Sequence, residues 1–340
     1  MPSAPPAFCY RPAARKPRFL AALCIAAGTG LLAACGSTAA SATGNAQVEK
    51  PDLTVAVVPA AGPAGLYIAQ MRGFFAAAGL HVTIKNVTSG SDAIADLIHG
   101  SVDVDQGQWT SDLGAEAAGV VKLHALAAGN AGAPGVEQLM VPPGSRIYSV
   151  KDLAGKTIAV NALDGLPQFL TDTVLATNGI DPSQVHFVAV PFPAMGKALL
   201  AHRVDAAFMI EPFVTQAENT SGLVTLFDLN DSPLPGLALT GYVTTQAWMT
   251  RYPKTAAAFT AALARGQELA ATSRPDVEKA LAKYTTISKQ TAAIMATGTF
   301  PQSVTTAALI RVGDLIQQEH GFKPGLHVNV TALAKEMTSR

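Results

Sequence analysis

Hydroxyl side chains follow two predicted strands of this sequence, at points where helices are expected to begin. Ser89, Gly90 and Ser91 follow one strand, and Thr110 follows another. Ser and Thr often cap helix starts, where free backbone N–H groups attract negative charge without any Lys or Arg. Two such starts facing one space would hold a carboxylate, a sulfonate or nitrate. Plain capping is the alternative interpretation at each position.

Aromatic and amide side chains near the same strand ends extend the set of candidate ligand-binding residues. Gln108 and Trp109 follow a predicted strand, so the Trp109 ring is expected to project into the same space and stack on a planar ligand. Tyr67 lies near the start of the first predicted helix, and Tyr242 lies on a strand that returns between two halves of the chain. For each ring, packing in the core is the alternative.

Polar and acidic side chains occupy similar places in the second half of the chain. Asn161 and Asp164 follow a predicted strand in NALDGLP, and Glu211 follows another in IEPF. A carboxylate at such a place accepts hydrogen bonds from an amine or a pyrimidine, or it caps the helix that Pro212 opens. Helix starts favour anions and carboxylates favour hydrogen-bond donors. The ligand class therefore stays open among an anion, a zwitterion and a neutral heterocycle.

Composition excludes several classes of protein. The 340 residues are 49% hydrophobic and 14% charged, which is typical of a globular chain with one or two domains. The formal net charge is zero, so no global field draws the chain to nucleic acid and we expect no such partner. The histidines are scattered, and no metal-ligand spacing or catalytic motif occurs. We therefore expect no catalytic residue, metal or cofactor.

The first 34 residues have the pattern of a secretory signal peptide. They hold four basic residues and no acidic one, and their apolar run FLAALCIAAGTGLLAA is too short for a good membrane span. The segment LAACG at 32–36 resembles the lipobox of bacterial lipoproteins, which predicts lipidation of Cys35. An ordinary cleavage site beside a chance Cys is the alternative. Residues 35–51 are small and polar, which is typical of a flexible tether.

Two series of alternating strand and helix patterns follow the tether. Short apolar strands are predicted at 53–58, 81–87, 102–106, 122–128, 156–160, 186–190, 205–210 and 223–229. Helical patterns separate these strands, and after residue 253 the chain is helical throughout. Strand–helix–strand units build right-handed crossovers and a parallel sheet covered on both faces. The predicted fold class is therefore α/β.

Two lobes are expected from these two series. We predict that lobe 1 comprises 52–142 and 238–340, with the C-terminal helices packed back on it, and that lobe 2 comprises 143–237. Two connections that cross between the lobes leave a cleft. Ligands of open parallel sheets bind outside the carboxyl ends of the strands, so the candidate site lies in this cleft.

Four segments carry a resemblance to a known family. They are LYIAQMRGFFAAAGLHVTI, IADLIHGSVDVDQGQW, SVKDLAGKTIAV and RVDAAFMIEPFVTQA. Their order and spacing resemble the SsuA/THI5-like family, the substrate-binding lipoproteins of ABC importers for nitrate, sulfonates, taurine and thiamine-precursor pyrimidines. The resemblance covers roughly 53–320. It implies a type II periplasmic-binding-protein fold with two crossover strands.

The resemblance also implies a function. It implies a monomeric receptor that closes on a small-molecule solute and delivers it unchanged to an ABC permease powered by a separate ATPase. A lipid anchor in the membrane would place this receptor in the cell envelope, at the outer face of the cytoplasmic membrane or in the periplasm. The alternatives are an enzyme of the same fold acting on a pyrimidine or menaquinone precursor, a metal-capturing receptor, and a sensory or structural lipoprotein.

Overall fold

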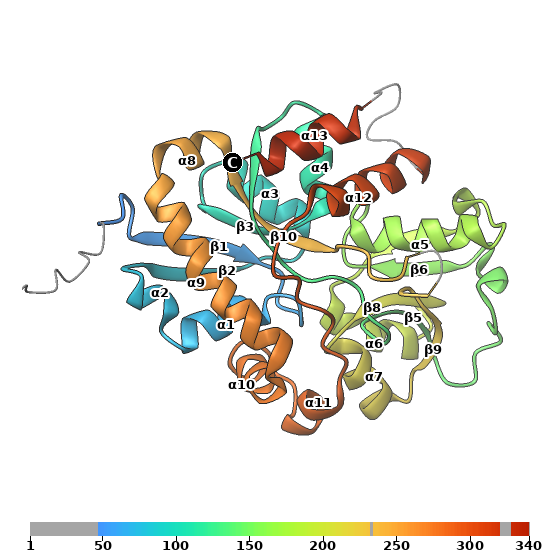
Figure 1. The fold of residues 1–340 in the computed structure, drawn as a ribbon. Coiled ribbons are helices and arrows are strands. Elements are labelled where there is room, and N and C mark those ends of the chain that lie inside the picture. The colour runs from blue at the N-terminus through green and yellow to red at the C-terminus, as the bar shows by residue number, and fades with distance from the viewer. Residues whose placement is uncertain (1–46, 232–233, 320–327, 340) are drawn as a thin grey trace, which may run out of the picture. The chain divides into compact units, whose positions relative to one another are not determined.

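Two five-stranded sheets organise residues 47–231, 234–319 and 328–339, which are the residues that this computed structural model describes (Figure 1). The predicted signal peptide, Cys35 and the predicted tether up to residue 46 lie outside the described residues. Among the described helices, none combines the length and apolar character that a bilayer crossing requires.

The first sheet has the strand order β2-β1-β3-β10-β4. Its strands are β1 (Asp52–Val57), β2 (His81–Asn86), β3 (Val104–Gln108), β4 (Leu123–Ala128) and β10 (Thr240–Thr245). β1 is parallel to β2 and β3, whereas β10 is antiparallel to β3 and β4. β10 joins this sheet after the chain has passed through the second lobe, as predicted for the strand that carries Tyr242.

The second sheet has the strand order β7-β6-β8-β5-β9. Its strands are β5 (Glu137–Val141), β6 (Thr157–Val160), β7 (His186–Ala189), β8 (Ala206–Ile210) and β9 (Val224–Asp228). β6 is parallel to β7 and β8, and β5 is antiparallel to β8 and β9. Each sheet therefore mixes parallel and antiparallel pairs.

All strands predicted from the sequence are present, but β5 was not among them. The expectation of purely parallel sheets is wrong at β5 and β10, because each of these strands enters its sheet from a crossover and not from a covering helix. Since β5 pairs within the second sheet, the second lobe begins at Glu137 and not after residue 142.

Helices cover both sheets (Figure 1). Those of the first lobe are α1 (Ala64–Met71), α2 (Phe74–Ala77), α3 (Gly90–Ile98) and α4 (Trp109–Ala117). Those of the second lobe are α5 (Leu166–Thr177), α6 (Phe192–Leu200) and α7 (Phe213–Ser221), with 3-10 turns η1 (Val150–Leu153) and η2 (Pro182–Gln184). The C-terminal helices are α8 (Gln246–Arg251), α9 (Pro253–Thr272), α10 (Arg274–Tyr284), α11 (Lys289–Ile294), α12 (Thr306–Glu319) and α13 (Val330–Thr338).

The C-terminal helices contact both lobes. α9 packs closely along α1. A Cβ on Gly266 would lie only 2.1 Å from the carbonyl oxygen of Gly65, so the two helices can approach this closely only with glycine at 266. α13 packs on β4, whereas α11 contacts α7 and α12 contacts both α4 and α5. The C-terminal helices, predicted to pack on the first lobe, therefore contact the second lobe as well, since α11 and α12 reach its helices α7 and α5.

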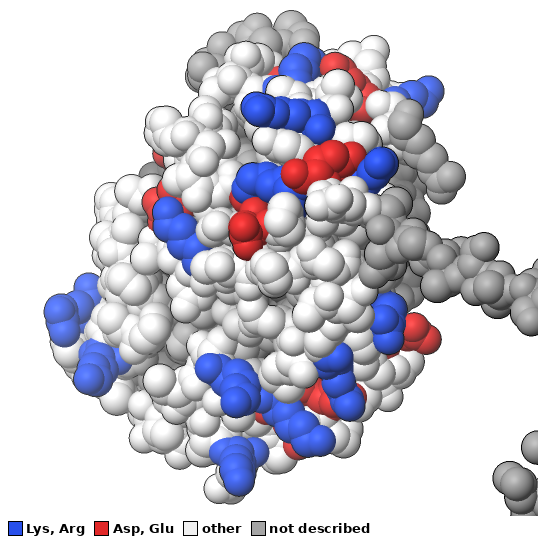
Figure 2. Space-filling model, turned by 90° about the vertical axis from the view of Figure 1, so that its left-hand side faces the viewer, with Lys and Arg blue, Asp and Glu red and all other residues white. Residues whose placement is uncertain are grey.

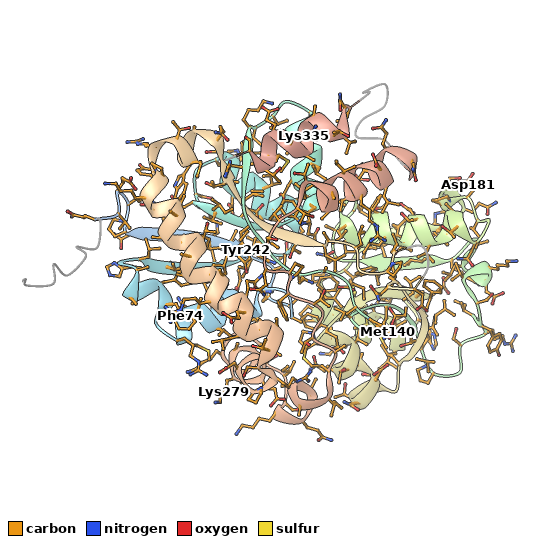
Figure 3. The ribbon with its side chains drawn as sticks, in the orientation of Figure 1. Phe74, Met140, Asp181, Tyr242, Lys279 and Lys335 are labelled. Carbon is orange, nitrogen blue, oxygen red and sulfur yellow. The ribbon has the colours of Figure 1, made fainter. Side chains whose placement is uncertain are left out.

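Each lobe has a closely packed interior. Tyr242 lies inside the first lobe and Met140 inside the second, and both side chains are fully buried (Figure 3). Tyr242 is buried with the apolar faces of α1, α9 and α10, while a second cluster of apolar side chains continues from α3 and α4 into the second lobe. Close packing of this kind makes the interior of each lobe rigid.

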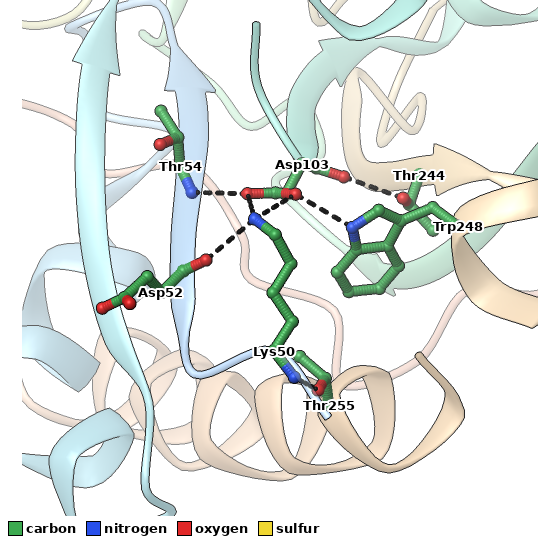
Figure 4. A network of polar contacts seen from close by, with 7 residues as sticks. All are labelled: Lys50, Asp52, Thr54, Asp103, Thr244, Trp248 and Thr255. Carbon is green, nitrogen blue, oxygen red and sulfur yellow. Dashed lines mark hydrogen bonds and ion pairs between the residues drawn. The ribbon is translucent and has the colours of Figure 1, made fainter. Parts of the chain in front are cut away.

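Asp103, in the GSVD segment of the sequence, ties together the amino-terminal ends of β1 and β3 (Figure 4). Its carboxylate accepts hydrogen bonds from Lys50 Nζ at 2.7 Å, Thr54 N at 3.0 Å and Trp248 Nε1 at 2.9 Å. Its carbonyl oxygen accepts a hydrogen bond from Thr244 Oγ1 at 2.8 Å. This acidic residue therefore has a structural role at the sheet edge opposite the carboxyl ends of the strands.

The surface that Figure 2 presents carries basic and acidic side chains side by side in its upper part, whereas basic side chains at its lower left have no acidic neighbour in this view. Where charges of opposite sign lie together they largely cancel at a distance, and salt screens what remains.

Candidate ligand-binding site

A cavity of about 60 Å³ lies where the carboxyl ends of strands from the two lobes meet. The first lobe and the crossovers contribute Val58, Ala60, Ala61, Gly62, Pro63, Gln106, Gln108, Asn130, Leu239 and Thr240. The second lobe contributes Val136, Glu137, Leu166, Pro167, Phe192, Phe208, Ile210 and Glu211. The cavity occupies the edge of the sheets that the sequence pattern indicated, and most of its wall is apolar.

Helices α1, α5 and α6 begin at the cavity with a proline at the N-cap or in the first turn, and α4 begins there at its N-cap Gln108, without one. Pro63 is the N-cap of α1, and Pro167 and Pro193 lie in the first turns of α5 and α6. Proline has no backbone N–H, so these helix starts offer fewer donors to an anion than ordinary ones. Their dipoles still place partial positive charge near the cavity.

Thr240 holds the polar groups of the first lobe in place. Its Oγ1 accepts hydrogen bonds from Gln106 Nε2 at 2.9 Å and Asn130 N at 3.0 Å, and donates to Asn130 Oδ1 at 2.6 Å. A Cβ on Gly62 would lie 2.6 Å from Asn130 Oδ1, so the loop after β1 can approach this network only with glycine there. The amides of Gln106 and Asn130 are thus fixed before any ligand arrives.

Glu211 lines the cavity and also links the lobes. Its carboxyl accepts hydrogen bonds from Thr215 Oγ1 at 2.6 Å, Thr215 N at 3.2 Å and Ala296 N at 3.2 Å, so it caps α7 as the capping alternative predicted. Its backbone carbonyl accepts a hydrogen bond from Ala61 N of the first lobe at 3.0 Å. Burial raises the pKa of Glu211, and the hydrogen bonds it accepts oppose this effect.

Glu137 and Gln108 face the cavity from opposite lobes and carry its unpaired polar groups. The Glu137 side chain is only 6% exposed, and no hydrogen bond or ion pair from the described residues reaches its carboxyl. Burial, together with the nearby charges of Asp228 and Glu211, raises the pKa of Glu137 to about 8. The amide of Gln108 likewise makes no hydrogen bond within the described structure. Both groups are therefore available to a ligand.

Positive side chains are missing from this part of the described structure. No Lys, Arg or His of the described residues lines the cavity. Likewise, within residues 47–231, 234–319 and 328–339, no group of three or more His, Cys, Asp or Glu side chains is arranged to hold a metal ion. What the cavity offers is carboxyl, amide and hydroxyl groups set in an apolar wall.

Of the residues predicted to bind ligand, Gln108 and Glu211 line the cavity and the hydroxyl-bearing helix starts do not. Ser89 Oγ accepts a hydrogen bond from Asp92 N at 3.1 Å and caps α3, with Gly90 as the first helical residue. Ser91 is exposed, and Thr110 lies half-buried in the first turn of α4. At α4 the N-cap Gln108 lines the cavity and Thr110 does not, and α1, α5 and α6 also begin at the cavity.

The predicted position of the Trp109 ring in the cleft is wrong. The ring is 2% exposed and lies against β10, where a Cβ on Gly241 would be 1.9 Å from Trp109 Cζ2. Because α4 begins at Trp109 itself, the backbone turns at this residue and directs the ring into the core and not beyond the strand end.

Tyr67 and Tyr242 also pack in the core, which was the alternative interpretation for each ring. Tyr67 stacks on Tyr284 with ring centroids 3.8 Å apart and donates a hydrogen bond to Asn86 Oδ1 at 3.3 Å. Tyr242 is fully buried and meets the edge of the Phe259 ring. Burial raises the pKa of Tyr67 to about 12, so its hydroxyl remains protonated. Neither ring lines the cavity.

Asn161 lies at a contact between the lobes, and neither Asn161 nor Asp164 lines the cavity. Asn161 Nδ2 donates a hydrogen bond to the carbonyl oxygen of Thr88 at 2.9 Å, which joins the second lobe to the first. Asp164 is exposed, has a positive φ of 55°, and donates its backbone N–H to Gln168 Oε1 at 3.0 Å. The Asn161 side chain therefore links the two lobes in the described structure.

Sequence reasoning missed several residues of the cavity. Glu137, Asn130 and Thr240 lie on or beside the crossovers, where no strand–helix alternation marks a strand end. A signal for Glu137 was present, since Pro134-Gly135 precedes a carboxylate at the head of the apolar run EQLMV. Phe192 and Phe208 resembled ordinary core residues by their spacing.

The mixed sheets, the two crossovers and a cavity lined from both lobes together define a two-lobed binding fold. The family model described as NMT1/THI5 like matches residues 61–276, and the chain belongs to this family. No curated protein matches the sequence significantly.

Solved structures share the fold. The alkanesulfonate-binding protein SsuA from Xanthomonas axonopodis pv. citri, bound to MOPS, has a TM-score of 0.72 and 18% identity, covering 85% of this chain and 99% of its own. The nitrate-binding protein NrtA from Synechocystis PCC 6803 has a TM-score of 0.70 and 13% identity, covering 86% and 87%. A protein from Bordetella bronchiseptica RB50 has a TM-score of 0.68 and 23% identity, covering 85% and 98%. The chain therefore has a periplasmic-binding-protein fold.

Proposed function

We propose that this protein is the solute-binding component of an ABC importer, and not an enzyme. The observation that carries the proposal is a cavity enclosed by residues of both lobes in a chain of this family. The structural neighbours SsuA and NrtA bind alkanesulfonate and nitrate, respectively. Sulfonates, taurine, nitrate and thiamine-precursor pyrimidines are the solutes to test first.

Capture in this mechanism depends on closure of the lobes and needs no covalent chemistry. The described lobes meet through hydrogen bonds between neutral groups, Ala61 N to the Glu211 carbonyl at 3.0 Å and Asn161 Nδ2 to the Thr88 carbonyl at 2.9 Å, and through an apolar cluster that continues from the first lobe into the second. Each such hydrogen bond contributes about 0.5–1.5 kcal/mol. In this mechanism bound solute shifts the population toward the closed form, and a permease reopens it.

We further propose that the protein is a monomer anchored by lipid at Cys35 after removal of 1–34, and that it works at the outer face of the cytoplasmic membrane with a permease and a separate ATPase. Hydrogen bonds at the start of the described chain fix the place from which the tether would leave the folded body. The Glu49 carboxylate accepts hydrogen bonds from Lys254 N at 3.1 Å and Thr255 N at 2.9 Å, at the beginning of α9. The tether would leave the folded body there.

A solute panel tests the proposed function. Purified protein is titrated with taurine, alkanesulfonates, nitrate and aminopyrimidines while its melting temperature is followed. At about one hundred times the dissociation constant, a bound solute adds about 2.7 kcal/mol of stability, which raises the melting temperature by about 5 °C. Mass spectrometry should recover the solute unchanged. Chemical conversion of a bound solute would favour an enzyme, and a folded sample that responds to no member of a broad panel would contradict a receptor.

A further inference from the structure

We infer that the solute carries a positively charged nitrogen group, such as a protonated amine or amidine, which docks on the Glu137 carboxylate between the lobes. The inference rests on the proposed function and specifies the chemistry of its ligand. It makes Glu137 the residue that determines specificity, although the cavity belongs to a fold whose structural neighbours bind anions such as nitrate.

The position of the Glu137 side chain carries the first step. It opens β5 at the floor of the cavity, is 6% exposed, and has no hydrogen-bond or ion-pair partner among the described residues. A carboxyl group buried in this way loses its hydration without replacement, which is unfavourable unless something else pairs with it. The cavity is the space from which such a partner can reach it.

The charges around the cavity carry the second step. Glu211 also lines it, and Asp228 of β9 lies close enough to Glu137 to raise its pKa. No Lys, Arg or His of the described lining opposes these carboxyl groups. Each helix start at the cavity contributes only about half an elementary charge, and prolines remove N–H donors from α1, α5 and α6, although not from α4. The field therefore favours a cation over an oxyanion.

Gln108 and the apolar wall define the rest of the ligand. The Gln108 amide faces the cavity from the first lobe, across from Glu137. Phe192 and Phe208 supply apolar surface on the second lobe. A compact solute with a cationic nitrogen at one end and a polar group at the other would contact both lobes at once, so the ligand itself would hold the lobes closed.

The Glu137 carboxyl is protonated in the ligand-free protein. Burial, together with the charges of Asp228 on β9 and Glu211 after β8, raises the pKa of Glu137 to about 8. At neutral pH the free protein therefore holds a proton there, and an arriving cation must displace it. Affinity for a cation should consequently rise as pH approaches 8, whereas affinity for an anion should fall.

Matched pairs of ligands test the inference at pH 7.5 by calorimetry. Taurine is compared with ethanesulfonate, which lacks only the ammonium group, and acetamidine with acetamide. We expect the cationic member of at least one pair to bind about tenfold or more tightly than its partner. Equal or tighter binding of ethanesulfonate or nitrate would overturn the inference and leave the proposed receptor standing. Failure of all four probes would also overturn it, and the wider solute panel then decides separately whether the protein is a receptor.

Variants test the assignment to Glu137. In Glu137→Gln we expect affinity for the preferred cationic probe to fall about 10- to 100-fold, because a charge-assisted hydrogen bond is lost. The control Glu268→Gln, exposed on α9, should leave affinity unchanged. Wild-type affinity should rise by up to about tenfold per pH unit from 6 to 7.5, and Glu137→Gln should lose this dependence. An unchanged pH profile in a Glu137→Gln sample that melts normally would overturn the assignment, as would weaker binding by Glu137→Asp than by Glu137→Gln.

Discussion

At the scale of single residues, the packing of the Trp109 ring depends on the absence of a side chain at Gly241. Its indole lies against β10 because Gly241 offers no side chain, and a Cβ there would overlap the ring. The neighbouring residue Gln108 faces the cavity. Two consecutive residues thus have opposite roles, since the chain changes from strand to helix between them.

A binding role and a packing role for Trp109 predict different results. Trp109→Ala should lower the free energy of unfolding by about 3–5 kcal/mol, because it leaves a void against Gly241. Trp109→Phe retains a ring and should cost less, while solute affinity stays within about twofold of wild type. Urea denaturation and solute titration measure the two quantities. Normal stability with a large loss of affinity in Trp109→Phe would contradict the packing role.

At the scale of elements, the junction of β3 and α4 holds two buried carboxyl groups. Asp105 and Asp112 are fully buried, and a Cβ on Gly107 would lie 2.6 Å from both Asp105 Oδ2 and Asp112 Oδ1. No hydrogen bond from the described residues reaches either carboxyl. Burial raises the pKa of both groups, and the proximity of Asp112 raises that of Asp105 further. The folded protein therefore retains protons that the unfolded chain releases.

This pair should make stability depend on pH. A raised pKa in the folded state contributes stability that is complete below the pKa of the unfolded carboxyl and is lost as pH rises. We therefore expect the free energy of unfolding to fall between pH 5 and pH 8, by up to about 1.4 kcal/mol per pH unit for each retained proton. Asp105→Asn should reduce this slope and be more stable than wild type at pH 8.

Urea denaturation at several pH values checks the prediction, with Asp52→Asn as the control because the Asp52 side chain is 84% exposed. Part of the slope should persist in Asp105→Asn, since the pKa of Glu137 is raised as well. A slope equal to that of wild type in Asp105→Asn would show that the pair does not hold a proton.

At the scale of the whole described body, a small number of polar contacts and an apolar cluster shared by both lobes hold the lobes together. Asn161 of the second lobe reaches the Thr88 carbonyl of the first, and α12 contacts both α4 and α5. Asn161 lies outside the cavity lining. A change at this residue should therefore alter the balance between open and closed forms without touching the solute.

Asn161→Ala tests this separation of roles. Losing one neutral hydrogen bond in the closed form should weaken solute affinity about 3- to 10-fold, with little change in the melting temperature of the free protein. The matched control is Asn178→Ala, whose amide donates to the Val174 carbonyl within one lobe at 2.8 Å. The control should affect stability and not affinity, as measured by calorimetry. Equal affinities of Asn161→Ala and wild type would contradict a role in closure.

Local patterns were enough to predict much of the fold. The strands at 81–87 and 186–190 and the helix at 166–177 follow from short apolar runs and helical periodicity, which depend on neighbours in the sequence. β5 could not be inferred in the same way, because it pairs antiparallel with β8 and β9 and has no covering helix before it. Its place depends on partners that lie far away in the sequence.

The amino-acid sequence alone determined the α/β class, the two lobes and the edge of the sheets at which a ligand would bind, since these follow from local periodicity and general rules of connection. Only the tertiary structure decided that Glu137 and Gln108 face the cavity while Trp109, Tyr67 and Tyr242 pack in the core. The reason is physical: a side chain lines a cavity according to how its backbone turns and which distant strands pack against it, and neighbouring residues in the sequence do not specify either.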